Sequence, residues 1–539
     1  MGMHNFVVPE REQLFLMPPD AREWLPARHL AWGVLEQAAG MDISPFLAWY
    51  RADGQGRRAY HPAMMVALVL YCYCKGIRSS RAIEMATFDD VGARVICGNL
   101  HPDHSTTARF VSRHEGPVKG LLVQSLVACA KEGLVSVDVV AGDGTKVKAS
   151  ASMAANATAG QLDLDIAELE ALLAAEVSTW MAQARAEDEA QDALFGGGDD
   201  APGGPRGGGR PGTPKRTADK LLRRQKARGR LAAEAAARQR DAETARAEKI
   251  ARLERRVAAR QATAGAEEAA AAARVARYQQ RAAAKAAAAR AKRPDGRVPV
   301  AAGDSAHVRG ARRRAAAARS ALAAAAAAPA VSADPARPPR ANTTDPSSRV
   351  MPAKQGGFLQ GYNPQVVAGA RQVIISIGTH DSPNDVAALH PALRLARVNL
   401  DAAGISDPIA IALFDAGYAS EANFTTACEA ELYVAVTRES RQTGRRRDGR
   451  KQASGYPGWQ AMTARLDTPE GKALYKRRSA MIEPVFAQLF ARLGRQLNYR
   501  DTKADLELHL WAASHNLLKA IRARARSAAP PPARLAPAS

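Results

Sequence analysis

A segment rich in alanine and arginine divides this chain of 539 residues. Residues 201–351 contain 34 Lys and Arg but only 12 Asp and Glu, so they account for the whole formal net charge of +22. The rest of the chain is therefore neutral. Any long-range attraction to a polyanion must come mainly from this segment.

The composition changes several times around this segment. Residues 162–194 predict an acidic helix, and the Gly- and Pro-rich residues 196–212 predict a flexible linker. Residues 217–292 have few helix breakers and predict one long helix or a helical hairpin. Residues 294–352 are rich in Ala, Pro and Arg and are expected to be disordered. A bias toward GC-rich codons would also produce this composition, so the fine sequence here is either neutral filler or selected for its charge.

The N-terminal part of the chain has the pattern of an all-helical region. Apolar residues recur at helical spacing over 20–133, and the most apolar run, 62–74, is shorter than the roughly 18 residues of a membrane span. The five cysteines lack zinc-ligand spacing, and an odd number without a secretory leader is typical of a reducing compartment. We therefore expect a soluble, cytoplasmic protein without a membrane partner. Nucleic acid is then the expected polyanion.

Two apolar segments each end in a single aspartate. The segment 135–141 leads into Asp143, which two glycines flank, and the segment 409–414 leads into Asp415. A predicted helix near the C-terminal end contains Glu483. The ordered segments follow the sequence strand, strand, strand, helix, strand, helix, strand, helix. This order predicts an α/β fold with a mixed sheet.

Asp143, Asp415 and Glu483 can converge at one edge of such a sheet. Carboxylate oxygens are the ligands that Mg²⁺ and Mn²⁺ prefer. Two ions roughly 3.5–4 Å apart would activate water or a 3′-hydroxyl and stabilise the leaving oxygen of a phosphodiester. Each acid alone also has a plainer interpretation, as a turn former or a solvated helix residue. The order and context of the three favour a metal site.

Three other aspartates compete for these roles. Asp381 and Asp385 follow another predicted strand, and Asn384 and Asp385 stand at a helix start, where capping is the expected role. Asp138 lies five residues before Asp143 in the same strand, so its side chain points to the opposite face. We interpret Asp138 as structural or exposed.

Several short motifs lie on both sides of the long middle segment or at its C-terminal end: GIRSSRAIE, PDHST, GDGTKVKASAS, TDPSSRVM, GGFLQGYNPQ, ALFDAGYAS, YKRRSAMIEPVF and HNLLK. Together they make the chain resemble the DDE transposases of bacterial insertion sequences, over residues from about 10 to 522 apart from the low-complexity block in the middle. The resemblance implies a helical DNA-binding region followed by an RNase-H-like catalytic core. It assigns Asp143, Asp415 and Glu483 as the catalytic ligands of two Mg²⁺ or Mn²⁺ ions. Tyr475 and Arg478 match the signature that precedes the family's glutamate and helps to hold the DNA end.

The predicted organisation has four parts. Residues 1–133 form the helical DNA-binding region, and residues 134–150 and 351–525 form the RNase-H-like core. Residues 151–350 form a basic insertion, helical or of low complexity, between the first and second strands. Residues 526–539 form a disordered tail.

The chain departs from the family at one position. The family usually has Lys or Arg seven residues after the glutamate, and this chain has Phe490. We expect Arg492 or Arg495 to replace that cation. The proline directly after Glu483 disfavours helical backbone before it, which predicts a kink or a new helical start.

The resemblance implies a cut-and-paste transposase that cleaves each element end and joins the freed 3′-hydroxyl to target DNA. The N-terminal helices would recognise terminal inverted repeats, and the middle segment and the loop at 445–451 would contact the DNA backbone, as would Lys146 and Lys148. The expected partners are double-stranded DNA and a second copy, as a homodimer assembled on DNA at the nucleoid. Phe490 keeps open a decayed or repurposed DNA-binding protein. A coiled-coil or nucleoid-packing protein would not explain the strands before Asp143 and Asp415.

Overall fold

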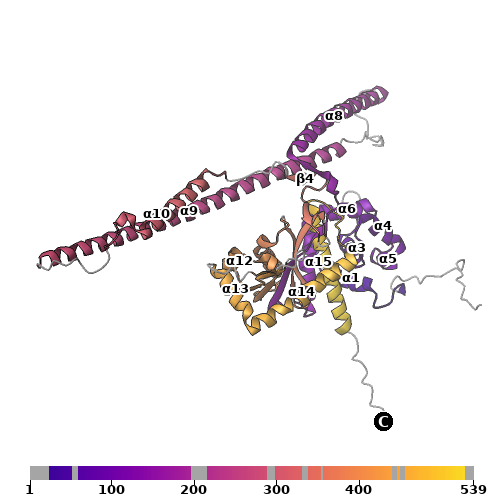
Figure 1. Cartoon of the computed structure of the whole chain (residues 1–539). Helices are drawn as coiled ribbons and strands as arrows, with labels where there is room; N and C mark the ends of the chain where they lie inside the picture. Colours follow the sequence, from indigo (N-terminus) through magenta and orange to yellow (C-terminus); the bar gives the residue numbers. More distant parts are fainter. Residues whose placement is uncertain are drawn as a thin grey trace, which may run out of the picture. The chain divides into compact units, whose positions relative to one another are not determined.

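The computed structural model describes residues 23–50, 59–195, 215–287, 298–329, 338–353, 356–380, 382–439, 446–448 and 456–527 (Figure 1). Its contacts divide the chain into two compact units. Met1–Asn156 with Asn342–Ser539 is the first unit, and Ala157–Ala341 is the second. The first unit therefore includes residues at both ends of the 151–350 segment that the sequence assigned to the insertion.

The first unit is built around a mixed sheet. Its strands are β1 (Val139–Gly144), β2 (Val147–Lys148), β5 (Arg349–Pro352), β6 (Phe358–Gly369), β7 (Ile374–His380), β8 (Ile411–Phe414) and β9 (Glu431–Val434). The central order is β7-β6-β1-β8-β9, in which β6 is antiparallel to both neighbours and β1, β8 and β9 are parallel. The short strands β2 and β5 pair with the N-terminal half of β6. The predicted mixed sheet is thus confirmed.

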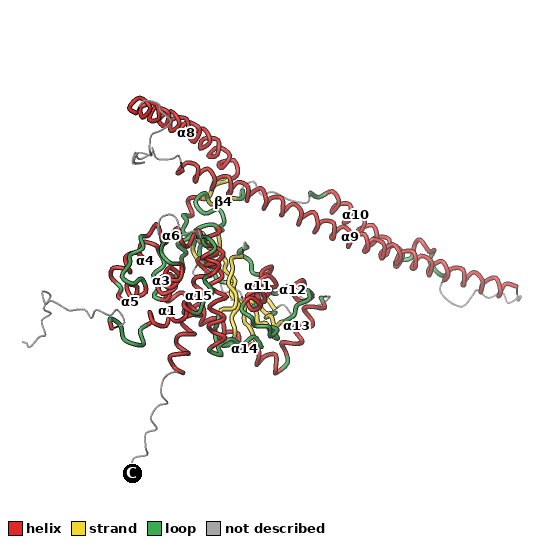
Figure 2. Tube along the Cα trace, turned by 180° about the vertical axis from the view of Figure 1, so that it is seen from behind, coloured by secondary structure: helices red, strands yellow, loops and turns green. Residues whose placement is uncertain are grey.

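Helices cover both faces of this sheet. The helices of the first unit are α1 (Leu30–Ala39), α2 (Ser44–Leu47), α3 (Pro62–Cys74), α4 (Ser80–Asp89), α5 (Val91–Ile96), α6 (His104–Arg113), α7 (Glu115–Lys131), α11 (Leu389–Ala402), α12 (Glu421–Thr425), α13 (Pro457–Asp467), α14 (Pro469–Leu493) and α15 (Thr502–Ser527) among the described residues. Figure 2 shows α15 on one side of the strands and α11 and α12 on the other. α14 shares a core with α15. A small two-stranded sheet joins β10 (Thr437–Glu439) to β11 (Arg446–Asp448).

Alternate residues of the central strands face these two helical layers. Ala141 and Leu413 pack in the core that contains the buried residues of α14 and α15. Val140 and Ala412 pack in a second core, with α11. Asp143 lies two residues beyond Ala141, so its side chain is directed to the α14 side. Asp138 is exposed, as expected.

The N-terminal helices share a core with the sheet. α3 is apolar around its whole circumference, and eleven of its thirteen residues are buried. Such a helix needs apolar neighbours on every side, and α15 supplies one of them. The buried Glu507 of α15 forms an ion pair of 2.8 Å with Arg78, in the loop before α4. The helical region therefore packs as part of the first unit.

α14 continues without interruption through Glu483 and Pro484. The predicted new helical start is wrong. A proline inside a helix removes one backbone hydrogen bond, and burial of Ile482, Val485 and Leu489 on either side holds the helix together.

The second unit consists largely of helices. They are α8 (Ala159–Phe195), α9 (Lys215–Ala287) and α10 (Ala306–Ala327), with the short helix η3 (Ala302–Asp304) before α10. Acidic residues of α8 pair with the first turns of α9, where Arg228 contacts Asp163 at 2.7 Å and Arg224 contacts Asp165 at 3.4 Å. The acidic helix thereby neutralises part of the basic one. The short strands β3 (Asn156–Thr158) and β4 (Arg340–Asn342) pair where the chain leaves and re-enters the first unit.

The expectation that residues 294–352 are disordered is wrong for the described part of that segment. α10 packs on α9 through Val308 and a row of buried alanines, because alanine has the highest helix propensity and permits close approach. Farther on, Asp345 is fully buried and accepts a hydrogen bond of 2.6 Å from the Tyr362 hydroxyl. At the C-terminal end, α15 includes residues 526 and 527, and the rest of the predicted tail lies outside the described residues.

Candidate active site

Asp143 and Asp415 occupy equivalent positions on neighbouring parallel strands. β1 and β8 pair in the register Ala141 with Leu413, and each aspartate comes two residues later. Asp143 is still within β1, whereas Asp415 begins the short helix η5 (Ala416–Tyr418) that follows β8. Because neighbouring strands lie about 4.8 Å apart, the two carboxylates share one edge of the sheet.

The glycines around Asp143 make room for the protein's own side chains. A Cβ atom at Gly142 would overlap the Phe414 ring. A Cβ atom at Gly144 would lie 2.5 Å from Gln365 Nε2 and 2.6 Å from Asp385 Oδ1. Each glycine therefore lets another side chain approach the strand closely. In the structure the close approach is made by residues that surround the aspartate.

Backbone amides fix both carboxylates. Asp143 Oδ1 accepts from the amide of Gly144 at 2.9 Å, and Asp415 Oδ1 accepts from the amide of Gly417 at 2.8 Å. The other oxygen of Asp143 forms an ion pair of 2.9 Å with Arg478 of α14, whose side chain is nearly buried. α14 thus delivers a cation to the strand that carries Asp143.

The pKa of Asp143 is raised to about 6. Burial is the main cause, the charge of Arg478 opposes it, and the nearby carboxylate of Asp415 raises the pKa further. The folded protein therefore binds a proton at Asp143 more tightly than the unfolded chain does. This contribution makes the metal-free protein less stable as pH rises from about 4 to 6 and is constant above that range.

We expect Asp143→Asn to remove this contribution. In metal-free buffer the unfolding free energy of the wild type should fall relative to that of the variant as pH rises from 4 to 6, by on the order of 1–3 kcal/mol. Chemical denaturation of both proteins across this range measures it. A difference that is independent of pH would show that Asp143 titrates normally.

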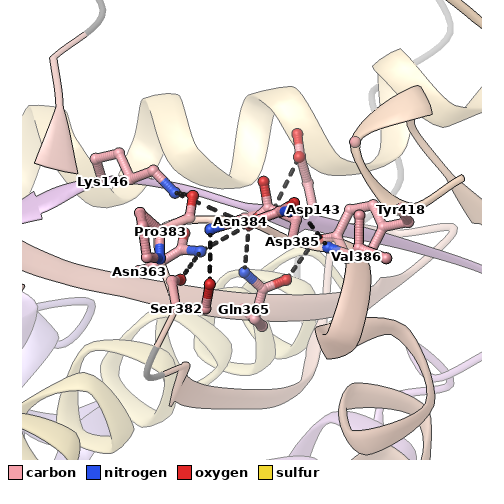
Figure 3. A network of polar contacts seen from close by, with 12 residues as sticks. Asp143, Lys146, Asn363, Gln365, Ser382, Pro383, Asn384, Asp385, Val386 and Tyr418 are labelled. Carbon is pink, nitrogen blue, oxygen red and sulfur yellow. Dashed lines mark hydrogen bonds and ion pairs between the residues drawn. The ribbon is translucent and has the colours of Figure 1, made fainter. Parts of the chain in front are cut away.

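Asp385 lies in the same network, and its expected role as a helix cap is wrong. It precedes the short helix η4 (Val386–Ala388) but makes no capping hydrogen bond there; Asn384 Oδ1 accepts from Val386 N at 3.2 Å instead. Asp385 Oδ1 accepts from Asn363 Nδ2 at 2.7 Å and from Gln365 Nε2 at 2.9 Å (Figure 3). Two amides of β6 therefore hold this carboxylate at the sheet edge.

Lys146 and Tyr418 join this network to the two strand-end aspartates. Lys146 Nζ donates to Pro383 O at 2.8 Å and lies 3.9 Å from Asp385 Oδ1. Burial lowers the pKa of Lys146, and the carboxylates of Asp385, Asp143 and Asp415 offset only part of this shift. The Tyr418 hydroxyl donates to Gln365 Oε1, and Tyr418 follows Asp415 in η5. Lys146 and Asp385 were named from the sequence, whereas Asn363, Gln365 and Tyr418 were not, because Asn, Gln and Tyr on a strand or turn carry no signal of their own.

Glu483 is exposed on α14. Across the parts of the chain that the structure describes, no three His, Cys, Asp or Glu side chains are grouped closely enough to hold a metal ion in this arrangement. The structure thus brings Asp143 and Asp415 to one edge, adds Asp385, and leaves Glu483 on the helix that contacts Asp143 through Arg478. Asp381, the other competing acid, lies outside the described residues.

Two family models match the chain. Residues 20–113 match a transposase domain (DUF772), and residues 334–518 match a transposase DDE domain. The chain belongs to the DDE transposases of insertion sequences. The second match includes Asp415 and Glu483, whereas Asp143 lies between the two matches and is joined to the DDE domain by the pairing of β1 with β6 and β8. The transposase matched no curated protein and no solved structure.

DDE transposases use divalent metal ions, and the donors at this sheet edge suit such an ion. Asp143 and Asp415 are hard oxygen ligands of the kind that Mg²⁺ and Mn²⁺ bind. Asn363 Oδ1 is buried next to Gly144 and has no hydrogen-bond donor among the described residues. An acceptor without a donor at a carboxylate-lined edge favours a cation or a bound water.

The residues expected to bind DNA lie in different surroundings in the transposase. Tyr475 is half-buried near Arg478, and burial raises the pKa of its hydroxyl to about 12. Lys148 and Arg495 are exposed, and the backbone amide of Lys148 donates to Arg495 O at 2.9 Å. Arg492 is turned inward, donates to Ser514 Oγ of α15 at 3.2 Å, and its pKa is lowered by burial.

Phe490 and Arg495 form a pair. The Arg495 guanidinium lies 4.2 Å from the centre of the Phe490 ring. Of the two arginines considered as replacements for the missing basic residue, Arg495 therefore brings its charge to the position of Phe490, and Arg492 does not. Most of the basic loop at 445–451 lies outside the described residues. None of the described helices is both long and apolar enough to cross a membrane.

Proposed function

We propose that this transposase hydrolyses a phosphodiester at each end of its element and joins the freed 3′-hydroxyl to target DNA. The observation that carries the proposal is the placement of Asp143 and Asp415 at equivalent positions on the adjacent parallel strands β1 and β8. The strand order β7-β6-β1-β8-β9, with only β6 antiparallel, supports an RNase-H-like core.

In this proposal Asp143, Asp415 and Glu483 bind two divalent ions, Mg²⁺ or Mn²⁺. Bound ions would supply charge neutralisation at the scissile phosphate and an activated water or 3′-hydroxyl. Glu483 is the third acid because it lies on α14, the helix whose Arg478 already reaches Asp143. Its exposed position leaves it free to contact a ligand bound over the sheet edge.

Arg478 is proposed to bind the DNA end. Its side chain is nearly buried and its Nη2 is paired with Asp143, whereas Nε has no hydrogen-bond acceptor among the described residues. A buried guanidinium with unused donors is suited to a phosphate, which binds Arg in a bidentate manner. Tyr475 lies on the same helix and would flank that phosphate.

The remaining DNA contacts are proposed to be electrostatic. Lys148 and Arg495 are exposed and adjacent, and Lys146 lies beside Asp385. The second unit carries 28 of the 59 arginines of the chain. Such contacts position the duplex without reading its sequence. We assign recognition of the inverted repeats to the N-terminal helices and assembly on DNA to a homodimer at the nucleoid.

A catalytically decayed DNA-binding protein is the second candidate, and Phe490 is the observation that favours it. Arg495 over the Phe490 ring weakens that argument, because a cation still reaches the position. Both strand-end aspartates are also present, and backbone amides fix the orientation of their carboxylates. We therefore favour the active enzyme.

We expect cleavage of a labelled inverted-repeat end by the wild-type protein in Mg²⁺ or Mn²⁺ and none after chelation with EDTA, because the carboxylates need the ion to act on a phosphate. The terminal repeats can be read from the DNA that flanks the gene. Gel electrophoresis of the products measures cleavage, and a gel shift on the same DNA measures binding. Binding without cleavage in either metal would support the decayed copy and make Phe490→Lys the next variant.

A further inference from the structure

Asp385 has a geometry that its position in the sequence does not explain. It stands between β7 and α11, caps no helix, and is tied to β6 by two side-chain amides. A carboxylate that binds a metal is usually itself held by such hydrogen bonds, which fix its orientation.

Only one oxygen of Asp385 is used in this way. Oδ1 receives both amide hydrogen bonds and faces Lys146, whereas Oδ2 has no hydrogen bond to the described residues. A Cβ atom at Gly417 would lie 2.8 Å from Asp415 Oδ1 and 3.6 Å from Asp385 Oδ2. The free oxygen of Asp385 and the carboxylate of Asp415 therefore flank the same glycine.

A second observation points to a ligand here. Asn363 is fully buried, and both hydrogens of its amide are used, one by Asp385 Oδ1 and one by Ser382 O at 3.0 Å. Its Oδ1 is left without a donor, next to Gly144. Among the residues that the structure describes, three aspartates and this oxygen face two cations, Lys146 and Arg478. The sheet edge therefore has an excess of oxygen acceptors.

We propose that Asp385 is a further carboxylate ligand of the divalent-ion site, with Oδ2 as the ligating atom beside Asp415. This inference rests on the proposed metal-dependent function. It adds a fourth acid, from the segment between β7 and α11, to the three that the sequence suggested. Lys146 balances the Asp385 charge while the ion is absent.

The test measures Mn²⁺ binding to the full chain by electron paramagnetic resonance. Asp385→Asn keeps an oxygen that accepts hydrogen bonds from Asn363 and Gln365 but loses the charge. Its fold should therefore be unchanged, which thermal denaturation measures. We expect its Mn²⁺ affinity to fall roughly tenfold or more. Asp415→Asn should show a similar loss. Asp401→Asn is the matched control, because Asp401 is exposed on α11 and its ion pair, as far as the chain is described, is with Arg397.

The outcomes separate this inference from the proposed function. Normal Mn²⁺ binding by Asp385→Asn, with loss in Asp415→Asn, would overturn the role of Asp385 and leave the proposed function standing. Equal binding by wild type, Asp385→Asn and Asp415→Asn would overturn both.

A second variant covers the case in which Asp385→Asn is destabilised. Asp385→Cys supplies a soft thiolate, so its preference for Cd²⁺ over Mn²⁺ should rise above that of the wild type. An unchanged metal preference would contradict ligation by residue 385, because a purely structural role does not alter metal selectivity.

Discussion

Asp415→Asn should abolish cleavage of an element end while leaving specific DNA binding intact. The substitution keeps the shape of the side chain and its hydrogen bond from the Gly417 amide, and it removes a negative charge that a divalent ion needs. Loss of several kcal/mol of charge stabilisation in the transition state corresponds to a reduction of the cleavage rate by roughly 10³-fold or more. A cleavage assay and a gel shift on the same labelled inverted repeat measure both effects.

The control for this experiment must be an aspartate away from the sheet edge. Asp385 is unsuitable, since the structure places it within the network around Asp143 and Asp415. Asp401→Asn serves instead, because its side chain is 62% exposed and its only ion pair among the described residues is with Arg397, one turn earlier on α11. Equal cleavage by Asp415→Asn and the wild type would end the catalytic assignment.

Removal of the second unit should weaken DNA binding and reduce its dependence on salt. The structure defines where to cut: the amide of Thr343 donates to Ala155 O at 2.8 Å, and Asn342 Nδ2 donates to Ser152 O at 2.8 Å. A short glycine linker can therefore replace residues 157–341 without disturbing β5 or Asp345. A deletion of 201–350 would remove β5 residues and Asp345 from the first unit.

Each phosphate contact that is lost should lower the slope of log affinity against log salt concentration by about one unit. We expect the deletion to lower the affinity for DNA roughly 100-fold at low salt. Circular dichroism should show that the first unit is still folded. The triple variant Arg252→Gln, Arg255→Gln, Arg256→Gln is the matched test, because these side chains are exposed on α9. An unchanged salt slope in both proteins would show that the second unit does not contact DNA.

The sequence determined the elements that depend on short-range patterns. Apolar runs bounded by glycine or polar residues located β6, β7, β8 and β9. Serine is a common helix cap, and Ser420 before α12 takes this role, since its Oγ accepts a hydrogen bond of 3.1 Å from the Asn423 amide. The first strand begins later than predicted, at Val139 instead of 135, and it includes Asp143. Strand boundaries depend on pairing partners, here β6 and β8, which are more than 200 residues away in the chain.

Helical order in the alanine-rich segment was underestimated for a related reason. Composition alone suggested a chain unable to bury enough apolar surface. Pairing of α10 with α9 supplies the missing burial, since Val308 and Ala311 have almost no exposure once the two helices pack. That contact joins parts of the chain separated by a linker, so a local pattern could not reveal it.

The sequence by itself determined that Asp143 and Asp415 end two apolar strands, because a hydrophobic run that stops at a carboxylate is a local feature. Only the tertiary structure decided which residues surround them. Register across β1, β6 and β8 places Gln365 opposite Gly144 and brings Asp385 to the same edge. The packing of α14 buries Arg478 against Asp143 and leaves Glu483 exposed. Side-chain direction depends on strand pairing and helix rotation, and both are fixed by long-range burial, which no short stretch of sequence encodes.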